Sequence, residues 1–315
     1  MFSIRRFFMN SNLILLAAMV LGLVAGDCAH LFKAWILPAL LLIMSLSTTQ
    51  VTLGNFTQVR LYLRDMAIVF VINYLFLSGL ILLASHLLIQ DHDLHVGFVI
   101  MAAIPSAVAV LPFTYLLKGE MMVSLLGSVG LYLGALGMAP LISLVFLDVA
   151  GMGLSRLIST LLQLIVVPFV VSRLLLKWNH FHRMREMTGI TINMALFLTI
   201  YTVMGINRST FLSHFDILIP LCFIAFLRTF ISGHLVDLVA RLLGVGRDRR
   251  MSYVLFGSFK NLAVVVAITL FLFDERSAIP ATVAIPFEIT FFIWFNFFQK
   301  RWGQWCTTQL SLHSK

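Results

Sequence analysis

The sequence predicts an all-α polytopic membrane protein with ten transmembrane helices, arranged as a 5+5 inverted repeat in which the fourth and ninth helices are broken. Three observations support this fold class. The 315 residues are 60% hydrophobic and 11% charged, with a mean hydropathy of +1.00, which is outside the range of soluble globular domains. Apolar stretches of bilayer length recur along the chain. Basic residues are concentrated in alternate loops, as the positive-inside rule requires.

The apolar stretches match the length that a lipid bilayer requires of a helix. The first one follows Arg5 and Arg6 and resembles a signal peptide, but a second apolar stretch follows almost at once. We therefore interpret the first stretch as a membrane helix. The predicted spans are 11–28, 31–49, 66–89, 96–117, 121–147, 153–177, 188–206, 213–243, 251–273 and 279–299. No polar stretch is long enough to form a soluble domain.

The charges of the loops give an independent indication of the number of spans. With the N-terminus inside, sixteen of the 22 Lys and Arg residues fall in cytoplasmic segments and four fall on the opposite side. The remaining two, Arg228 and Lys260, lie inside predicted helices. This asymmetry predicts that both termini are cytoplasmic, in a bacterial inner membrane or a plasma membrane. It also explains the net charge of +9 without nucleic acid, because the sequence has no basic stripe with interleaved aromatic residues.

Ten spans divide into two groups of five, which we place at residues 1–150 and 151–315. An odd number of spans in each group gives the two halves opposite orientations, as in many inverted-repeat transporters. The fourth span of the first half contains Pro105 and Pro112, and proline removes a backbone donor and clashes with the preceding turn. The fourth span of the second half contains Gly-Ser-Phe-Lys-Asn at 257–261. Two interrupted helices at matching positions predict a central binding site.

Arg228, Lys260 and Glu288 place ionisable side chains inside apolar parts of the predicted spans. Placing the ammonium of Lys260 at bilayer depth costs roughly 2.5 to 3.5 kcal/mol, so such a residue normally faces a polar cavity and has a partner. Neither His234 nor Asp237 shares a helix face with Arg228, so we expect its partner on another helix, with Glu288 as the leading candidate. Lys260 is an alternative partner for Glu288, and a structural ion pair and a proton carrier are both open interpretations of this carboxyl group.

Two stretches of the chain have the pattern of a known transporter family. They are PSAVAVLPFTYLLKGEMMVSLLGSVG at 105–130, and GSFKNLAVVVAITLF at 257–271 followed by IPATVAIPFEI at 279–289. The first resembles the fourth and fifth helices of the bile acid:sodium symporter (SBF-like) family, and the second resembles its ninth and tenth helices. The resemblance extends over about residues 50 to 300. It implies a core domain in which two unwound helices cross, a panel domain of flanking helices, and alternating access by motion of one domain against the other.

The resemblance also shows where this chain departs from the sodium-coupled members. The family's Ser-Asn pair after the fourth-helix break falls at Val110 and Leu111, which have no side-chain oxygen. The family's ninth-helix Glu falls at Phe256 and its following Gln at Lys260. Sodium needs several oxygen ligands and no adjacent fixed cation. We therefore expect both sodium sites to be lost and transport to be independent of sodium.

Lys260 is expected to place its ammonium where a sodium ion would bind. A fixed positive charge at the crossing, together with the N-terminal ends of half-helices, favours a small organic anion such as a carboxylate or a bile-acid-like molecule. Because burial disfavours the charged form of an amine, Lys260 is also a candidate for proton exchange. The alternative is sodium symport of the same kind of anion. The predicted substrate-binding residues are Ser106, Thr114, Ser258 and Asn261. The predicted ion- or proton-coupling residues are Lys260, Ser124, Ser128, Asn73, Glu288 and Arg228.

Other functional classes have less support in the sequence. A membrane enzyme would need clustered His, Asp or Glu residues, or a nucleophile with a base, and we find no such pattern. A channel would need a filter or a ring of like charges, and the sequence shows neither pattern. His180 and His182 have no third metal ligand nearby, and the three cysteines have neither disulfide nor metal spacing. We expect no metal and no cofactor beyond a coupling proton or sodium ion. The expected partners are membrane lipid and the organic anion. The sequence does not predict an oligomeric state.

Overall fold

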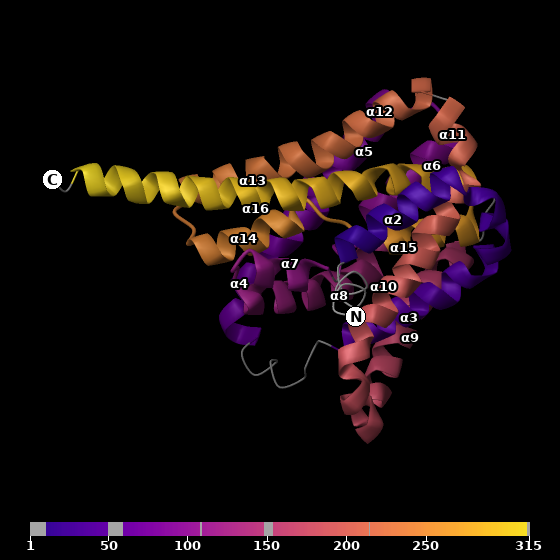
Figure 1. Ribbon diagram of the computed structural model, residues 1–315, viewed down its shortest axis with the longest axis horizontal. Coiled ribbons are helices and arrows are strands. Elements are labelled where there is room, and N and C mark those ends of the chain that lie inside the picture. The colour runs from indigo at the N-terminus through magenta and orange to yellow at the C-terminus, as the bar shows by residue number, and fades with distance from the viewer. Residues whose placement is uncertain (1–10, 50–58, 108, 148–153, 214, 314–315) are drawn as a thin grey trace.

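The computed structural model describes residues 11–49, 59–107, 109–147, 154–213 and 215–313, and every regular element within them is a helix. Figure 1 shows their arrangement. In chain order the elements are α2 (Ser11–Val24), η1 (Gly26–Trp35), α3 (Ile36–Thr48), α4 (Val59–Phe70), η3 (Val71–Leu77), α5 (Ser78–Leu88), α6 (His92–Ala103), α7 (Val110–Leu116), α8 (Met121–Phe146), α9 (Leu154–Lys177), α10 (Asn179–Ile206), α11 (Arg208–Ser213), α12 (Phe215–Phe226), η5 (Leu227–Ile231), α13 (Ser232–Leu242), α14 (Arg247–Phe256), α15 (Leu262–Leu272), η6 (Glu275–Ala278) and α16 (Ile279–His313).

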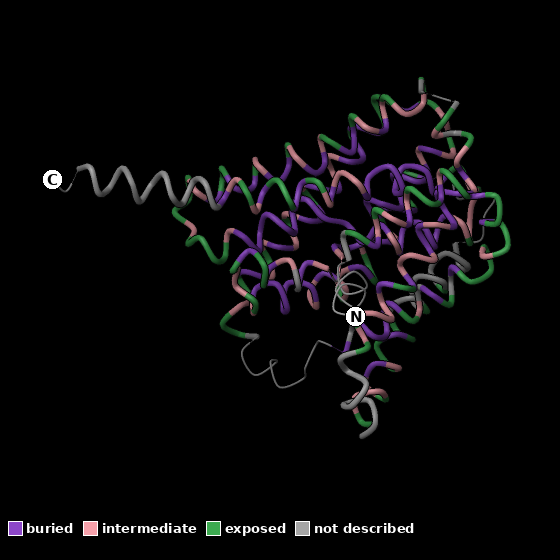
Figure 2. The backbone as a smooth tube through the Cα atoms, in the orientation of Figure 1, coloured by how far each residue is buried: buried purple, intermediate pink, exposed green. Residues whose placement is uncertain are grey.

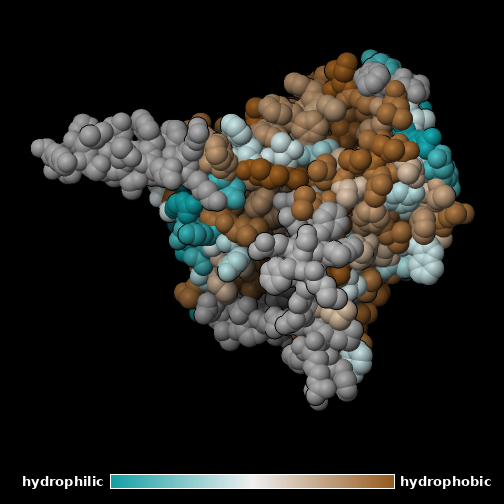
Figure 3. Space-filling model, viewed as in Figure 1, coloured by the Kyte–Doolittle hydropathy of each residue, from teal (hydrophilic) through white to brown (hydrophobic). Residues whose placement is uncertain are grey.

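Several of these helices are long and apolar enough to cross a bilayer. Five described helices qualify by length and composition, or six if a bent pair near the N-terminus counts as one span. The five are Arg60–Leu88, Met121–Phe146, Met187–Ile206, Asp216–Leu242 and Glu275–Gln299. In Figure 3 hydrophobic residues cover much of the visible side of the molecule, and hydrophilic residues gather at two opposite ends. The chain therefore has the helices of a polytopic membrane protein, while the number of ten spans stays a prediction.

The connection between the first two predicted spans is longer than expected. We expected a short link between residues 28 and 31, but α2 ends at Val24 and α3 begins at Ile36. The 3₁₀ helix η1 fills the interval, and the chain turns by 120° where it leaves α2. Asp27 and Lys33 lie in η1 and form ion pairs with other connections, so this segment belongs to the polar surface.

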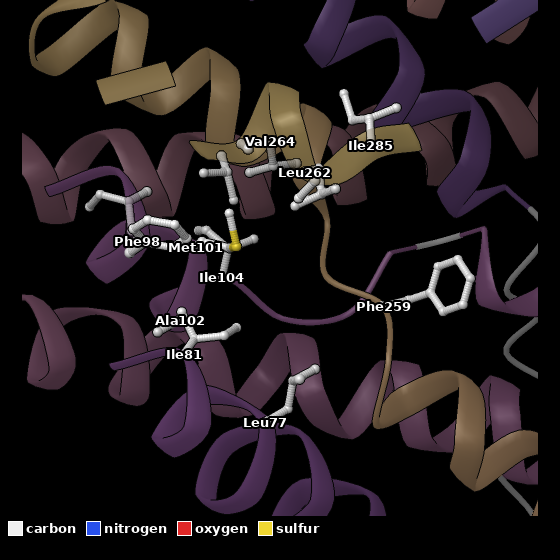
Figure 4. Close-up of a cluster of buried hydrophobic side chains, with 14 of the residues drawn as sticks. Leu77, Ile81, Phe98, Met101, Ala102, Ile104, Phe259, Leu262, Val264 and Ile285 are labelled. Carbon is white, nitrogen blue, oxygen red and sulfur yellow. The ribbon is translucent and has the colours of Figure 1, made fainter. Parts of the chain in front are cut away.

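Two helices are interrupted, at the predicted fourth and ninth spans. The first break separates α6 from α7, and the second separates α14 from α15. The two breaks touch, because the backbone N–H of Asn261 donates to the carbonyl of Pro105 at 3.0 Å. Figure 4 shows the two non-helical segments passing each other near Phe259, with Ile104 and Leu262 at the adjoining helix ends. The structure therefore has the two broken helices that the sequence predicts, in contact at their breaks.

The helices pack in two groups. The first group consists of α2, η1, α3, α9 and α10, which pack mainly on one another. The second consists of α4 to α8 and α12 to α16, which surround the two breaks. Buried residues are concentrated in the second group (Figure 2), and every residue from 251 to 262 is buried. We call the first group the panel and the second the core.

Ion pairs join connections that the charge pattern assigns to the same side of the membrane. The connections that the charge pattern assigns to one side are joined by Lys33 with Glu275, Arg208 with Asp27 at 2.7 Å, and Arg276 with Asp91 at 2.7 Å. The connections assigned to the opposite side are joined by a backbone hydrogen bond, in which the N–H of Glu120 donates to the carbonyl of Asp248 at 2.9 Å. This grouping is the one expected if the spans alternate in direction as the sequence predicts.

The two halves of the core share a helix irregularity and a short motif. The π-helix η3 is followed by Ser78-Gly79 and the π-helix η5 by Ser232-Gly233. The surrounding sequences are Phe-Leu-Ser-Gly at 76–79 and Phe-Ile-Ser-Gly at 230–233, a shift of 154 residues. The same shift brings the starts of α6, α7 and α8 to within four residues of the starts of α14, α15 and α16. The order of irregular helix, broken helix and continuous helix is thus repeated.

Gly205 allows α10 to pack closely on η1. A Cβ added at this position would lie 2.5 Å from the Cβ of Ala29 and 3.0 Å from the Cα of Gly26. Because overpacking of this kind typically costs about 1–3 kcal/mol, we expect Gly205→Val to lower the melting temperature of the detergent-purified protein by several degrees. Gly189→Val on the same helix is the control, since a Cβ there meets nothing within 4 Å. Equal stability of the two variants would contradict this packing.

Candidate functional site

The ammonium of Lys260 lies in a cage of oxygen atoms where the two breaks meet. The residue is fully buried. Its Nζ donates to the side chains of Asn73, at 3.0 Å to Oδ1, and Ser78, at 2.8 Å to Oγ. It also lies 3.3 Å from the carbonyl of Asn73, 3.1 Å from that of Ala102 and 3.0 Å from that of Ile104. Five oxygens, none of them from a carboxylate, therefore surround the amino group of Lys260.

The π-helix η3 supplies two of these oxygens, both from Asn73, and Ser78, the first residue after it, supplies a third. A π-turn inserts one extra residue into a helix and is often found at functional sites. Here the N–H and the hydroxyl of Ser78 both donate to the carbonyl of Asn73, so the turn places both residues on the side of Lys260. The side-chain amide of Asn73 donates to the carbonyl of Phe256 at 2.9 Å. The ring of Tyr74, 5.1 Å from Nζ, adds a cation–π contact. The third predicted span is thereby tied to both broken helices.

The other two oxygens come from the C-terminal end of α6. The last carbonyls of a helix have no intrahelical donor and carry partial negative charge, so a cation is favoured there. The carbonyl of Ala102 is in the last turn of α6, and that of Ile104 is just beyond it. Figure 4 shows Ile104 where the non-helical segment begins, and Ala102 on the preceding helix near Ile81. Half-helix ends and unwound carbonyls are also the groups that bind coupling cations in many transporters.

Arg228 and Glu288 form a buried ion pair beside this cage. Arg228 is fully buried, and its Nη2 donates to Glu288 Oε1. The same guanidinium nitrogen donates to the carbonyl of Ser258 at 3.3 Å. The prediction that Glu288 is the partner of Arg228 is confirmed. Lys260 also contacts Glu288, but through its backbone and not through its amino group: the backbone N–H of Lys260 donates to Glu288 Oε1 at 3.0 Å. The carboxylate of Glu288 therefore binds the second break directly through the N–H of Lys260, and indirectly through Arg228, which donates to the carbonyl of Ser258.

Two predicted hydroxyl groups bind each other away from the cage. Thr114 Oγ1 lies 2.6 Å from Ser124 Oγ and donates to the carbonyl of Val110 at 2.8 Å. Ser258 Oγ donates to the carbonyl of Val254, in the last turn of α14, at 2.7 Å. Thr114, Ser124 and Ser258 thus already have protein partners, and none of the three hydroxyls is bound to Lys260 Nζ.

Of the remaining predicted residues, Asn261 lies at the contact between core and panel. Asn261 Nδ2 donates to the hydroxyl of Tyr132 at 3.0 Å and approaches the sulfur of Met44, on panel helix α3, at 3.6 Å. Its Oδ1 accepts from the backbone of Val264 at 3.3 Å and caps α15. Ser106 and Ser128 are buried, and their hydroxyls have no hydrogen-bond partner among the described residues. They are the predicted groups with unused hydrogen-bonding capacity.

No cluster of three or more His, Cys, Asp or Glu residues suited to a metal ion occurs within the described ranges. The side chains of His180 and His182 lie outside the described part of the chain. The acidic groups that are described near the site are instead bound to arginine, as Glu288 shows.

Sequence comparison places the chain in a family. The model of the SBF-like CPA transporter family matches residues 40–290, which include both broken helices and the Lys260 cage. The chain belongs to this family. None of the curated proteins matches it. Membership of the SBF-like CPA transporter family confirms the resemblance seen in the sequence and makes the chain an integral, multi-pass membrane protein of a transporter class, in keeping with the expected non-enzymatic role.

Sequence reasoning missed several groups of the site. Ser78, Tyr74 and the carbonyls of Ala102 and Ile104 contact or face Lys260, yet none of them is unusual in an apolar helix. A signal for Ser78 was present, because the Phe-X-Ser-Gly motif occurs at matching positions in the two halves. The carbonyls of Ala102 and Ile104 have no such marker, because every residue has a main-chain carbonyl whatever its side chain.

Proposed function

We propose that this protein is a secondary transporter that moves a small organic anion by alternating access, with Lys260 in place of the coupling cation of sodium-linked relatives. The observation that carries the proposal is the position of Lys260 Nζ among five oxygens, two of them at the end of α6 and three from Asn73 and Ser78. A fixed ammonium in this cage neutralises the half-helix end without a bound ion. Transport is therefore independent of sodium, and is either proton-linked or facilitated.

The architecture in this proposal is a 5+5 inverted repeat of residues 1–150 and 151–315, with both termini cytoplasmic in a bacterial inner or plasma membrane. Support comes from the repeated order of π-helix, broken helix and continuous helix, and from the Phe-X-Ser-Gly motif in each half. The sixteen cytoplasmic basic residues of the charge pattern support the orientation. Motion of the panel against the core would open the crossing to each side in turn.

The charge of the crossing favours an anion. Arg228, Lys260 and Glu288 together leave one excess positive charge in a buried region. The N-terminal end of α15, which carries partial positive charge, begins at the same crossing. Ser106 and Asn261 are the best-placed substrate contacts, since the hydroxyl of Ser106 is unused and the amide of Asn261 lies at the contact with the panel.

The proposal is tested by ligand-induced stabilisation followed by uptake, both in sodium-free buffer. Small carboxylates and sulfonates are screened against the detergent-purified protein, each beside its neutral amide analogue. A ligand that binds only the folded state raises the melting temperature by mass action. We expect stabilisation by an anion but not by its amide, and uptake of that anion into proteoliposomes with choline as the only other cation. Stabilisation by neutral or cationic compounds alone, or uptake only with sodium, would refute the proposal.

A further inference from the structure

The 154-residue shift that superposes the two Phe-X-Ser-Gly motifs also pairs the carbonyls at the two breaks. It relates Ile104, just beyond α6, to Ser258, just beyond α14. The carbonyl of Ile104 accepts from Lys260 Nζ at 3.0 Å. The carbonyl of Ser258 accepts from Arg228 Nη2 at 3.3 Å. The equivalent carbonyl in each half is therefore bound by a buried cationic side chain.

The surroundings of Arg228 resemble those of Lys260 in other respects. Arg228 lies in the π-helix η5, and the oxygens of Asn73 that bind Lys260 lie in the π-helix η3. Arg228 Nη1 reaches the sulfur of Met101 at 3.6 Å, in the last turn of α6, and its Nε donates to Thr229 Oγ1 at 3.1 Å. Each cation thus contacts both a π-helix and the ends of broken helices.

A simple structural ion pair would explain the contact of Arg228 with Glu288 but not its contact with a half-helix end. The guanidinium is fully buried and divides its donors between the carboxylate and the carbonyl of Ser258. The oxygen of Glu288 that it binds also accepts the N–H of Lys260, so the pair sets the conformation of the break that carries Lys260. Neutralising the partial negative charge at the end of α14 is a function that Glu288 itself, being an anion, cannot perform.

We propose that Arg228 is a second fixed cation of this transporter, and that it holds the end of α14 as Lys260 holds the end of α6. It is a positioning residue that acts through the second break and needs no contact with the substrate. The inference rests on the proposed role of Lys260 as a fixed cation. Together the two side chains would occupy both half-helix ends at which a transporter of this architecture can bind a coupling cation.

Removal of the Arg228 guanidinium should leave a group of oxygen atoms that can bind a small cation. Arg228→Ala leaves a carboxylate, a main-chain carbonyl and the hydroxyl of Thr229 facing the vacated space, because these are the oxygens that Arg228 binds. Carboxylate and carbonyl oxygens are the ligands that small hard cations prefer. The variant should therefore gain a binding site for sodium or lithium, which the parent protein does not have.

The test is the melting temperature of detergent-purified protein in sodium, lithium or choline chloride at constant ionic strength. We expect Arg228→Ala to melt below the parent in choline and to regain about 3 °C or more in saturating sodium or lithium. Arg228→Ala/Glu288→Gln should show no such response, because the anionic ligand is lost. Arg228→Lys, which keeps the charge, should remain insensitive to sodium. Arg228→Gln replaces the alanine variant if that protein cannot be purified, with the same expectation.

A loss of stability in Arg228→Ala or Arg228→Gln without any cation response would overturn the inference and leave only a structural ion pair. Lys260→Ala, measured in parallel, separates this outcome from failure of the proposed function. If Lys260→Ala responds to sodium and the Arg228 variants do not, Lys260 alone is a fixed cation. If Lys260→Ala does not respond either, the fixed-cation account of the proposed function fails as well.

Discussion

Lys260→Ala is expected to reduce uptake of the transported anion to background and to lower the melting temperature by roughly 10 °C in sodium-free buffer. The substitution removes the donor that the carbonyl of Ile104 and the side-chain oxygen of Asn73 share, while the carbonyl of Ala102 keeps the hydroxyl of Ser78 as a donor. Each buried polar group left unsatisfied costs about 1–3 kcal/mol, so the two together make a loss of about 4 kcal/mol. Uptake and thermal unfolding of the same preparation measure the two effects.

Two further variants show whether the charge itself is needed. Lys177→Ala removes an exposed lysine at the end of α9 and should leave both readouts near those of the parent. Lys260→Met keeps most of the side-chain volume without the ammonium, and should fail in transport as Lys260→Ala does. A Lys260→Met protein that is stable and active would contradict the proposed role of the cation.

Glu288→Ala is expected to destabilise the protein by about 3–5 kcal/mol, because it leaves the buried guanidinium of Arg228 without its counter-charge. It also removes the acceptor of the Lys260 N–H, so the second break loses a backbone contact. Glu288→Ala/Arg228→Met should be less destabilised than the sum of the two single variants, since no unpaired charge remains. Thermal unfolding of the four proteins gives this coupling directly.

Glu275→Ala is the matched control for the Glu288 experiment. Glu275 also pairs with a basic residue, Lys33, but both side chains are more than one third exposed, at 37% and 45%. Exposed ion pairs contribute about 0–1 kcal/mol, so this variant should unfold close to the parent. If Glu288→Ala proved no less stable than Glu275→Ala, the buried pair would not hold the crossing together.

The helical membrane fold could be predicted because apolar stretches of bilayer length and alternating loop charges are direct physical requirements of a membrane. Pro105 and the polar segment at 257–261 revealed the two breaks, since both interrupt an apolar helix. The bend at η1 could not be predicted to the residue, because Asp27 and Lys33 lie between two apolar stretches without a proline or a long polar loop. Nor does the sequence mark the π-helices, which differ from α-helices by a single inserted residue.

The candidate site was predictable where a charge lies in an apolar helix. Lys260, Arg228 and Glu288 are conspicuous for this reason, and the structure brings all three together. Family resemblance groups Ser124 with Lys260, whereas Ser124 binds Thr114 instead. The oxygens that hold the ammonium are mostly main-chain carbonyls, and their positions depend on where helices end in three dimensions.

The most direct test of the fixed-cation account is the effect of sodium on the parent protein. Its melting temperature is measured in detergent from pH 5 to 8, in sodium chloride and in choline chloride at constant ionic strength. A coupling ion that binds the folded state would raise the melting temperature by mass action. With Lys260 occupying the oxygen cage, we predict the same melting temperature in both salts at every pH. Stabilisation specific to sodium would contradict the account and restore sodium symport as the mechanism.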